Sequence, residues 1–285
     1  MSIPIIDTHV HIWDLIKVHY SWLQGDTSIL ARNYLPDEIY PQLSKVNVTS
    51  AVLVQAANNI EDTELMLSAA LKNDWIKGVV GWVPLEDPSK TQALIENWKA
   101  TQPYIKGIRH LIHNEANDHW LLQDNVIESL KILAHHHITY DIVGVKEAHL
   151  KAAIAIAEKI PSLNLVLDHL NNPPMTNQSA MDTWRTNIKL AAAHKNIYAK
   201  ISGLALATGK FETWTSADIQ SSIEYALEKF GTDRCFCGGD WPVSLLAGGF
   251  IKSINAYREV IENCLPEIDQ EKVYFKNATL FYKLL

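Results

Sequence analysis

Two histidines separated by one residue, His9 and His11, follow an apolar run near the start of the chain. On a β-strand, side chains two positions apart point to the same face, and two residues of rise put these imidazoles about 6–7 Å apart at the backbone. The pair could bind one metal ion or polarise one substrate group. Zn²⁺ favours such nitrogen ligands, and a catalytic site keeps one position open for water. An isolated pair could equally be two histidines that hydrogen bonds satisfy within a strand.

Two further polar clusters end apolar runs later in the chain. The run NLVLDHL ends with His169 and its neighbours, and FCGGDWPV contains Asp240. In a (β/α)₈ barrel, catalytic groups collect at the C-terminal ends of the strands, whereas the opposite end serves stability. Three clusters in equivalent positions therefore predict one site that joins His9, His11, His169 and Asp240.

Short apolar runs alternate with amphipathic stretches along nearly the whole chain. Several runs, such as SAVLVQAA and GVVGWVPL, are continuously apolar, as strands are when both faces are buried in a parallel sheet. Eight strand–helix units close naturally into a barrel. We therefore expect an α/β fold, a (β/α)₈ TIM barrel, as a single domain over residues 1–285. An open doubly wound sheet is the competing architecture, although the glycine-rich first turn that often marks it is missing. The predicted strands are Ile3–Trp13, Thr49–Ala57, Lys77–Leu85, Lys106–His113, Ile138–Val145, Asn164–Leu170, Ile197–Leu204 and Cys235–Val243.

Capping residues mark several predicted helix ends. Asp62 and the pair Asp87-Pro88 resemble helix starts, because acids cap the N-terminus and proline suits the first helical position. Gly231 resembles a helix stop. The C-terminal segment DQEKVYFKNATLFYKLL predicts a closing helix.

Composition limits the possible partners and the compartment. The chain is 47% hydrophobic with a net charge of −7, and it has no run of lysine and arginine, so nucleic acid is a poor candidate partner. The sequence has no window of 18 or more uninterrupted apolar residues, so we expect no membrane span. Three sparse cysteines and an N-terminus without a signal-peptide pattern favour a reducing cytoplasm. We expect a small-molecule substrate, with a homodimer as one option for assembly.

The segments IIDTHVHIWD, KGIRHLI, LVLDHLNNPP, YAKISGL and GGDWPVSLLAGG, with the closing FKNATLFYKL, together resemble lactonases of the amidohydrolase superfamily (amidohydrolase-2 type). The resemblance covers nearly the whole chain and is nearest to the branch of L-fuconolactonase-like sugar lactonases and 2-pyrone-4,6-dicarboxylate lactonase. It implies that His9 and His11 are the first-strand pair and His169 the later histidine, and that these three and Asp240 are the candidate metal ligands. It also implies that Asp240 accepts a proton from the attacking water, while a metal or the histidines polarise the carbonyl.

The fourth predicted strand departs from the superfamily pattern. Many members carry a lysine or glutamate there that bridges two metals, whereas KGIRHLI has Arg109 and His110. We therefore expect Zn²⁺ or another single divalent metal, or none. Arg109 is a candidate catalytic residue, since a guanidinium binds carboxylates or polarises oxygens with two donors. A structural ion pair is its alternative role.

Five residues are candidate substrate contacts. Flat indoles suit the apolar face of a sugar ring, although core packing is the commoner use of tryptophan. A carboxylate on the fifth strand could line the site or pair with Arg109, and a loop histidine could contact hydroxyls or solvent. The candidates are Trp22, Arg32, His113, Asp141 and Trp241.

The function predicted from these features is hydrolysis of a small sugar-derived lactone by an activated water. Of the five arginines, Arg32 and Arg109 are expected near the active end, fewer than a dicarboxylate lactone would require. A metal-dependent decarboxylase of an aromatic or unsaturated acid in the same superfamily is the first alternative. A barrel that binds a small ligand without catalysis is the second. The missing Gly-x-Ser-x-Gly motif disfavours a serine esterase.

Overall fold

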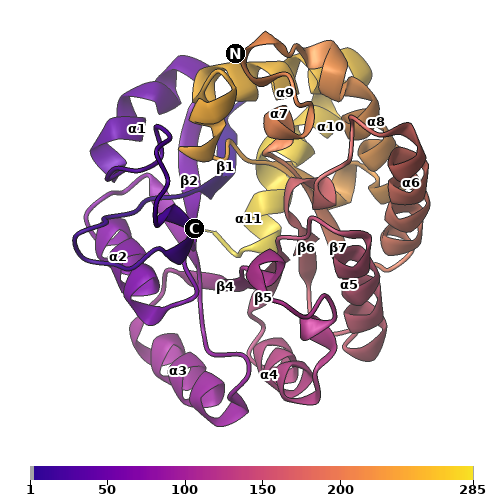
Figure 1. Ribbon diagram of the computed structural model, residues 1–285. Coiled ribbons are helices and arrows are strands. Elements are labelled where there is room, and N and C mark those ends of the chain that lie inside the picture. Colours follow the sequence, from indigo (N-terminus) through magenta and orange to yellow (C-terminus); the bar gives the residue numbers. More distant parts are fainter. Residues whose placement is uncertain (1–2, 285) are drawn as a thin grey trace.

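The computed structural model describes residues 3–284, so residues 1, 2 and 285 of the predicted single domain lie outside it. Within the described range, eight parallel strands pair in sequence order from β1 to β8. A parallel bridge between Val10 and Trp241 brings β1 against the segment that follows β8. Helices surround the strands (Figure 1). The predicted (β/α)₈ barrel is confirmed. The strands are β1 Ile5–Val10, β2 Val48–Val54, β3 Ile76–Gly81, β4 Ile105–His110, β5 Thr139–Ile142, β6 Leu165–Leu167, β7 Ile197–Ile201 and β8 Cys235–Cys237.

The strands end earlier than the apolar runs predict. The largest difference is at β8, which ends at Cys237, whereas the apolar run continues to Val243. Two glycines and then Asp240, with a φ of 54°, turn the chain away from the ladder at this point. The residues after the turn remain apolar because they pack over the end of the barrel. His11, His169 and Asp240 therefore lie just beyond their strands, whereas His9 lies within β1.

The helix-end predictions are confirmed at two positions and corrected at one. Asp87 caps α3 by accepting from the backbone N–H of Lys90, with Pro88 as the first helical residue. Gly231 follows the last residue of α8. Asp62 does not cap α2. Asn59 is the cap, and Asp62 turns inward to accept from Tyr20 and two backbone N–H groups. The longer helices are α1 Pro36–Leu43, α2 Ile60–Ala70, α3 Pro88–Thr101, α4 Asp124–His135, α5 Glu147–Lys159, α6 Gln178–Ala192, α8 Ser216–Phe230 and α9 Phe250–Cys264; shorter ones are α7 Leu204–Ala207, α10 Glu267–Glu271 and α11 Asn277–Phe281.

The closing helix α11 covers one end of the barrel (Figure 1). Its Phe281 and the following Tyr282 join a buried cluster with side chains from several strands, among them Val52, Val166 and Phe236. This apolar cluster closes the end opposite to the polar strand ends. No helix of the described chain is long and apolar enough to cross a membrane.

Candidate active site

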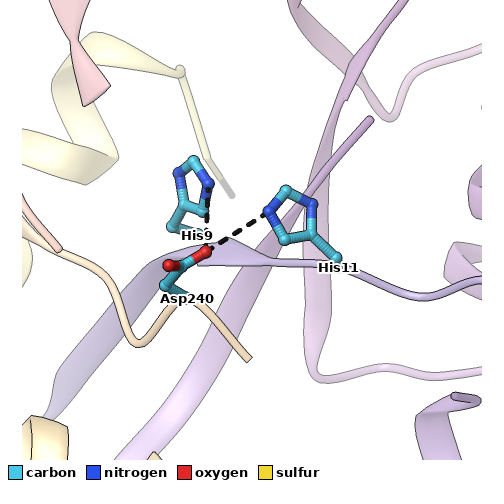
Figure 2. Close-up of side chains that lie close together, drawn as sticks. All are labelled: His9, His11 and Asp240. Carbon is cyan, nitrogen blue, oxygen red and sulfur yellow. Dashed lines mark ion pairs between the residues drawn. The ribbon is translucent and has the colours of Figure 1, made fainter. Parts of the chain in front are cut away.

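His9, His11 and Asp240 meet at the polar end of the barrel. His9 belongs to β1, His11 follows that strand, and Asp240 lies in the turn after β8 (Figure 2). One carboxylate oxygen, Oδ1 of Asp240, lies 3.7 Å from Nε2 of His9 and 3.5 Å from Nε2 of His11. All three residues are buried, with at most 4% of their surface exposed. The sequence-predicted convergence of the first and last strands is therefore present.

Asp7 fixes the backbone that carries these three side chains. Its Oδ1 accepts from the backbone N–H of His9 at 2.9 Å and of Gly239 at 2.8 Å, so it ties β1 to the turn after β8. A Cβ at Gly238 would lie 2.6 Å from the Cβ of His9. Glycine is required there because the two backbones approach so closely. Asp240 in turn donates its backbone N–H to the carbonyl of His9.

His169 reaches the site from an unusual turn after β6. Four consecutive residues, 169 to 172, have positive φ values between 49° and 55°. L-residues other than glycine seldom adopt this conformation, and strained backbone concentrates at functional sites. The His169 ring lies 4.5 Å from the His9 ring, and its Nδ1 is 2.8 Å from Oγ of Ser202. A Cβ at Gly203 would lie 2.4 Å from that same Nδ1, so Gly203 makes room for the ring.

The tautomer of His11 follows from its hydrogen bond to β2. Nδ1 of His11 lies 2.7 Å from the carbonyl oxygen of Val54, which can only accept, so Nδ1 carries the proton. Nε2 then faces Oδ1 of Asp240, 3.5 Å away. A cation or a proton between these two buried atoms would satisfy both.

This arrangement fits a single divalent metal ion. One nitrogen each from His9 and His11 and one oxygen from Asp240 lie within 4.8 Å of one another. Two imidazoles and a carboxylate form a donor set that zinc accepts, with room left for water. The carbonyl of Val54 would hold His11 in the ligating tautomer. His169, our fourth candidate ligand, lies beside His9 but is not part of this three-residue group.

A cluster of buried charges lies beside His9. Nη1 of Arg109 is 3.1 Å from Asp168, and Nζ of Lys200 is 2.8 Å from Asp168 and 2.7 Å from Asp141. Both cations also approach the His9 ring at 3.3 Å, Arg109 at Nε2 and Lys200 at Nδ1. The two cations and the two carboxylates balance each other's charge.

Burial and these partners set the protonation of the site. Burial lowers the pKa of His9 well below its ordinary value, with the Lys200 charge adding to the effect. Burial acts to raise the pKa of Asp168, but Lys200, His9 and Arg109 together hold it well below the usual range. Burial raises the pKa of Asp7 to about 7. The imidazole of His9 is therefore neutral, while Asp168 keeps its negative charge.

A cavity of about 330 Å³ opens over this group. Small-molecule sites typically occupy roughly 300–1,000 Å³. Several of our candidates line the cavity together with apolar residues such as Leu111 and Leu206. Burial lowers the pKa of His113 to about 4, so this side chain is neutral at the cavity wall. The candidates that line the cavity are Trp22, Arg109, His113, His11, His169 and Asp240.

Three candidate substrate contacts lie elsewhere. Arg32 pairs with Glu38 and stacks over a tyrosine ring at 3.8 Å, so its charge is held at the surface. Asp141 lies inside the barrel and pairs with Lys200 rather than with Arg109. Trp241 is fully buried: its backbone bridges to Val10, and its ring packs against that of Tyr34 at 5.3 Å. None of these three residues lines the cavity.

Sequence reasoning missed Lys200 and Gln55. Lys200 alternates with apolar residues in β7 and is completely buried. Gln55 follows β2 and accepts from Arg109 through both its side chain and its backbone carbonyl. A lysine inside the otherwise apolar segment IYAKI was an available signal, since lysine is almost never fully buried without a partner.

Comparison with known proteins agrees with this geometry. The family model described as Amidohydrolase matches residues 6–284. The chain is 29% identical to an L-fucono-1,5-lactonase of Burkholderia ambifaria over 98% of this chain and 95% of that protein. It is 28% identical to an L-fucono-1,5-lactonase of Burkholderia multivorans over 98% and 96% of the two chains.

A solved structure is similar in fold as well. It is an amidohydrolase from Burkholderia multivorans with bound zinc, and it superposes with a TM-score of 0.89 at 26% identity, covering 99% of this chain and 100% of that one. The match of the family model extends over nearly every described residue. The chain therefore belongs to the amidohydrolase family, as its sequence motifs predicted.

Proposed function

We propose that this chain hydrolyses a small sugar-derived lactone, with Asp240 as the general base. The observation that carries the proposal is the position of the Asp240 carboxylate. It lines the cavity, and its Oδ1 lies 3.5 Å from Nε2 of His11 and 3.7 Å from Nε2 of His9. A carboxylate in such a place can take a proton from a water molecule bound in the cavity. The similarity to two L-fucono-1,5-lactonases supports a lactone as the substrate.

The reaction requires a nucleophilic water and an electrophilic carbonyl. Asp240 removes a proton from water, and the oxygen attacks the lactone carbonyl carbon. Arg109 and His169 line the same cavity and can donate hydrogen bonds to the carbonyl oxygen as it becomes negative. The ring C–O bond then breaks, and the leaving alkoxide takes the proton back from Asp240. The product is the open hydroxy acid.

A divalent metal fits the donors of His9, His11 and Asp240. When bound, such an ion supplies Lewis acidity at the carbonyl or lowers the pKa of a bound water. We propose a single ion, zinc or another divalent metal.

The charge of the cavity favours a neutral substrate. Of the two arginines considered from sequence, Arg109 lines the cavity and Arg32 does not. Arg109 is also already paired with Asp168. A dicarboxylate would require free cationic partners, whereas a polyhydroxy lactone can use the indole of Trp22 and the imidazole of His113.

A lactone panel tests the substrate class. We expect the purified protein to open L-fucono-1,5-lactone or a related aldonolactone faster than 2-pyrone-4,6-dicarboxylate lactone, as followed with a pH indicator. The reverse order would contradict the choice of a neutral lactone. Release of CO₂ from an aromatic acid, without any lactone turnover, would instead identify a decarboxylase. Turnover of neither class would leave a ligand-binding barrel. Size-exclusion chromatography of the same sample would test a homodimer.

Zinc binding is tested without reference to activity. After dialysis against a chelator, titration calorimetry should find one Zn²⁺ per chain, and zinc at about 100 times Kd should add about 2.7 kcal/mol to the free energy of unfolding. His11→Asn should weaken binding because it removes a ligand nitrogen. His135→Asn is the matched control, since His135 is exposed on α4. Equal zinc affinity of wild type and His11→Asn would overturn this ligand assignment.

A further inference from the structure

A second cavity adjoins the first at the same end of the barrel. Its volume is about 380 Å³, and it lies between the start of α5, the turn after β6 and the N-terminal half of α6. Val145 and Asn172 line both cavities. A molecule bound over His11 and Asp240 could therefore extend past Val145 and Asn172 into the second cavity. We call this second cavity the α5–α6 groove.

The groove is rich in neutral hydrogen-bonding groups. Amides and hydroxyls contribute most of its polar lining, and Trp184 gives an apolar surface. The charged residues at its edge are already paired, Lys146 with Asp118 and Glu147 with Lys151, each at 2.6 Å. An uncharged ligand with many hydroxyls matches this chemistry better than an ion. The neutral polar residues of the lining are Asn171, Asn172, Asn177, Ser179, Thr183 and Asn187.

One buried amide in the groove lacks a protein partner. Asn171 is only 4% exposed, and its Oδ1 accepts no hydrogen bond from any described residue. A Cβ at Gly144 would lie 2.0 Å from this oxygen, so the chain leaves space for the amide. A buried acceptor without a partner is destabilising by about 1–3 kcal/mol. The oxygen lies against Gly144 with almost no accessible surface, so a ligand hydroxyl would satisfy it only after the side chain turns toward the groove.

The same strained turn serves both cavities. His169 lines the first cavity, Asn171 lines the groove, and Asn172 lines both. All three have positive φ values within the left-handed turn at residues 169–172. Strain of this kind persists only where the surrounding structure holds it. The turn therefore keeps the groove at a fixed position relative to the reacting centre.

We propose that the α5–α6 groove binds a second, neutral sugar unit attached to the lactone ring, so that the chain acts on glycosylated aldonolactones. This inference rests on the proposed lactonase function. The reaction remains that of a simple lactone: water adds to the carbonyl carbon, the ring ester bond breaks, and the glycosidic bond is untouched. The second unit contributes binding energy through the neutral amides and hydroxyls that line the groove.

The test compares substrates and one matched pair of variants. The substrates are L-fucono-1,5-lactone, D-glucono-1,5-lactone and three disaccharide lactones built on the glucono ring, namely cellobiono-, maltobiono- and isomaltobiono-1,5-lactone. Thr183→Trp would fill the groove. Thr186→Trp is the control, because Thr186 is exposed on the same helix but does not line the groove. Each threonine hydroxyl donates to the carbonyl four residues earlier, so the two changes remove equivalent bonds.

We expect kcat/KM for at least one disaccharide lactone to exceed that for D-glucono-1,5-lactone by about 10-fold, equivalent to one or two net hydrogen bonds. Thr183→Trp should bring kcat/KM for the disaccharide lactone down to that for D-glucono-1,5-lactone, and Thr186→Trp should keep the 10-fold difference. Hydrolysis of the monosaccharide lactones with no gain for any disaccharide, or a ratio that Thr183→Trp leaves unchanged, would overturn the groove assignment and leave the lactonase function standing. Failure to hydrolyse any lactone would refute both.

Discussion

The two sides of His9 differ in how completely their polar groups are satisfied. On one side, the Asp240 carboxylate and Nε2 of His11 face each other at 3.5 Å and border the cavity. On the other side, Arg109, Lys200 and two aspartates form ion pairs in which each charge has an opposite partner. We call these the open side and the paired side of the site.

The difference separates groups that react from groups that hold them. Unsatisfied acceptors in a buried place bind water, metal or substrate strongly, because the alternative is an unpaired polar group. A balanced set of buried ions keeps its members rigid. Of this set only Arg109 also lines the cavity, where it can donate to a substrate oxygen as well. His9 contacts both sides, so the paired side fixes the ring whose far nitrogen faces Asp240.

A change on the open side should affect activity far more than stability. Asp240→Asn keeps the size of the side chain, and asparagine tolerates the positive φ of 54° at this position. We expect kcat/KM for the best lactone to fall about 1,000-fold, since general-base catalysis contributes roughly 10²–10⁴. The midpoint of urea unfolding should change little. Retained activity would remove Asp240 from its role as the base.

A change on the paired side should do the reverse and act first on stability. Lys200→Met leaves the carboxylates of Asp141 and Asp168 buried without their cation. Breaking a buried ion pair in this way is destabilising by about 3–5 kcal/mol, measured as the free energy of unfolding in urea. Lys200→Arg keeps the charge and should lose less.

Lys210→Met is the surface control for this prediction. Lys210 is 54% exposed and pairs with Asp218, so its loss should change stability by about 1 kcal/mol or less. If Lys200→Met and Lys210→Met were equally stable, the paired side would not be a structural unit.

The open side was predictable from sequence because local rules determine it. The alternation of side chains along β1 places His9 and His11 on the same face at the C-terminal end of that strand. Asp240 lies in the apolar run that follows β8. In a closed parallel barrel these ends must meet. The barrel itself followed from eight apolar runs separated by helical patterns.

The paired side was not predictable because it depends on long-range register. Arg109 on β4 and Asp141 on β5 lie opposite each other in the strand register. Their side chains nevertheless form ion pairs with other residues, Arg109 with Asp168 and Asp141 with Lys200. Lys200 is one lysine in an apolar strand, and sequence alone does not say whether it points inward. The turn after β6 was hidden for another reason. Asn171 and Asn172 tolerate a left-handed conformation, but His169 and Leu170 rarely adopt it, so no local preference indicates that the turn begins at residue 169.

The third prediction probes how His169 is held on the open side. Gly203→Ala would put a Cβ 2.4 Å from Nδ1 of His169 at a φ of 60°. Gly231→Ala adds backbone strain without a clash, because Gly231 has a φ of 74° and a ψ of 163° and no atom within 4 Å of the added Cβ. Both changes should be destabilising by about 1–3 kcal/mol. Only Gly203→Ala should also lower kcat/KM, by about 10-fold, because a displaced imidazole loses its hydrogen bond in the transition state. Equal activity of the two variants would show that the position of His169 does not matter.

The smallest effect is expected when His113, on the cavity wall at the open side, is replaced. The quantity that should change is the pH dependence of the unfolding free energy. Burial lowers the pKa of His113 from 6.5 to about 4 in the folded chain. Between these values the unfolded chain binds a proton there that the folded chain does not, so stability falls as the pH drops from 6.5 to 4. One such group gives a slope of at most about 1.4 kcal/mol per pH unit.

His113→Asn should therefore make the loss of unfolding free energy between pH 6.5 and pH 4 shallower than in wild type. The loss should not vanish, since burial also lowers the pKa of His9 and His169. Urea titrations at half-unit pH steps measure how the unfolding free energy changes with pH. The difference in unfolding free energy between wild type and variant at pH 7.5 gives the effect of the substitution that does not depend on proton binding. A variant curve parallel to that of wild type over the whole range would mean that His113 takes up its proton equally in both states. In that case the wall of the cavity would be open to water, and the contrast between the two sides of His9 would lie in pairing alone.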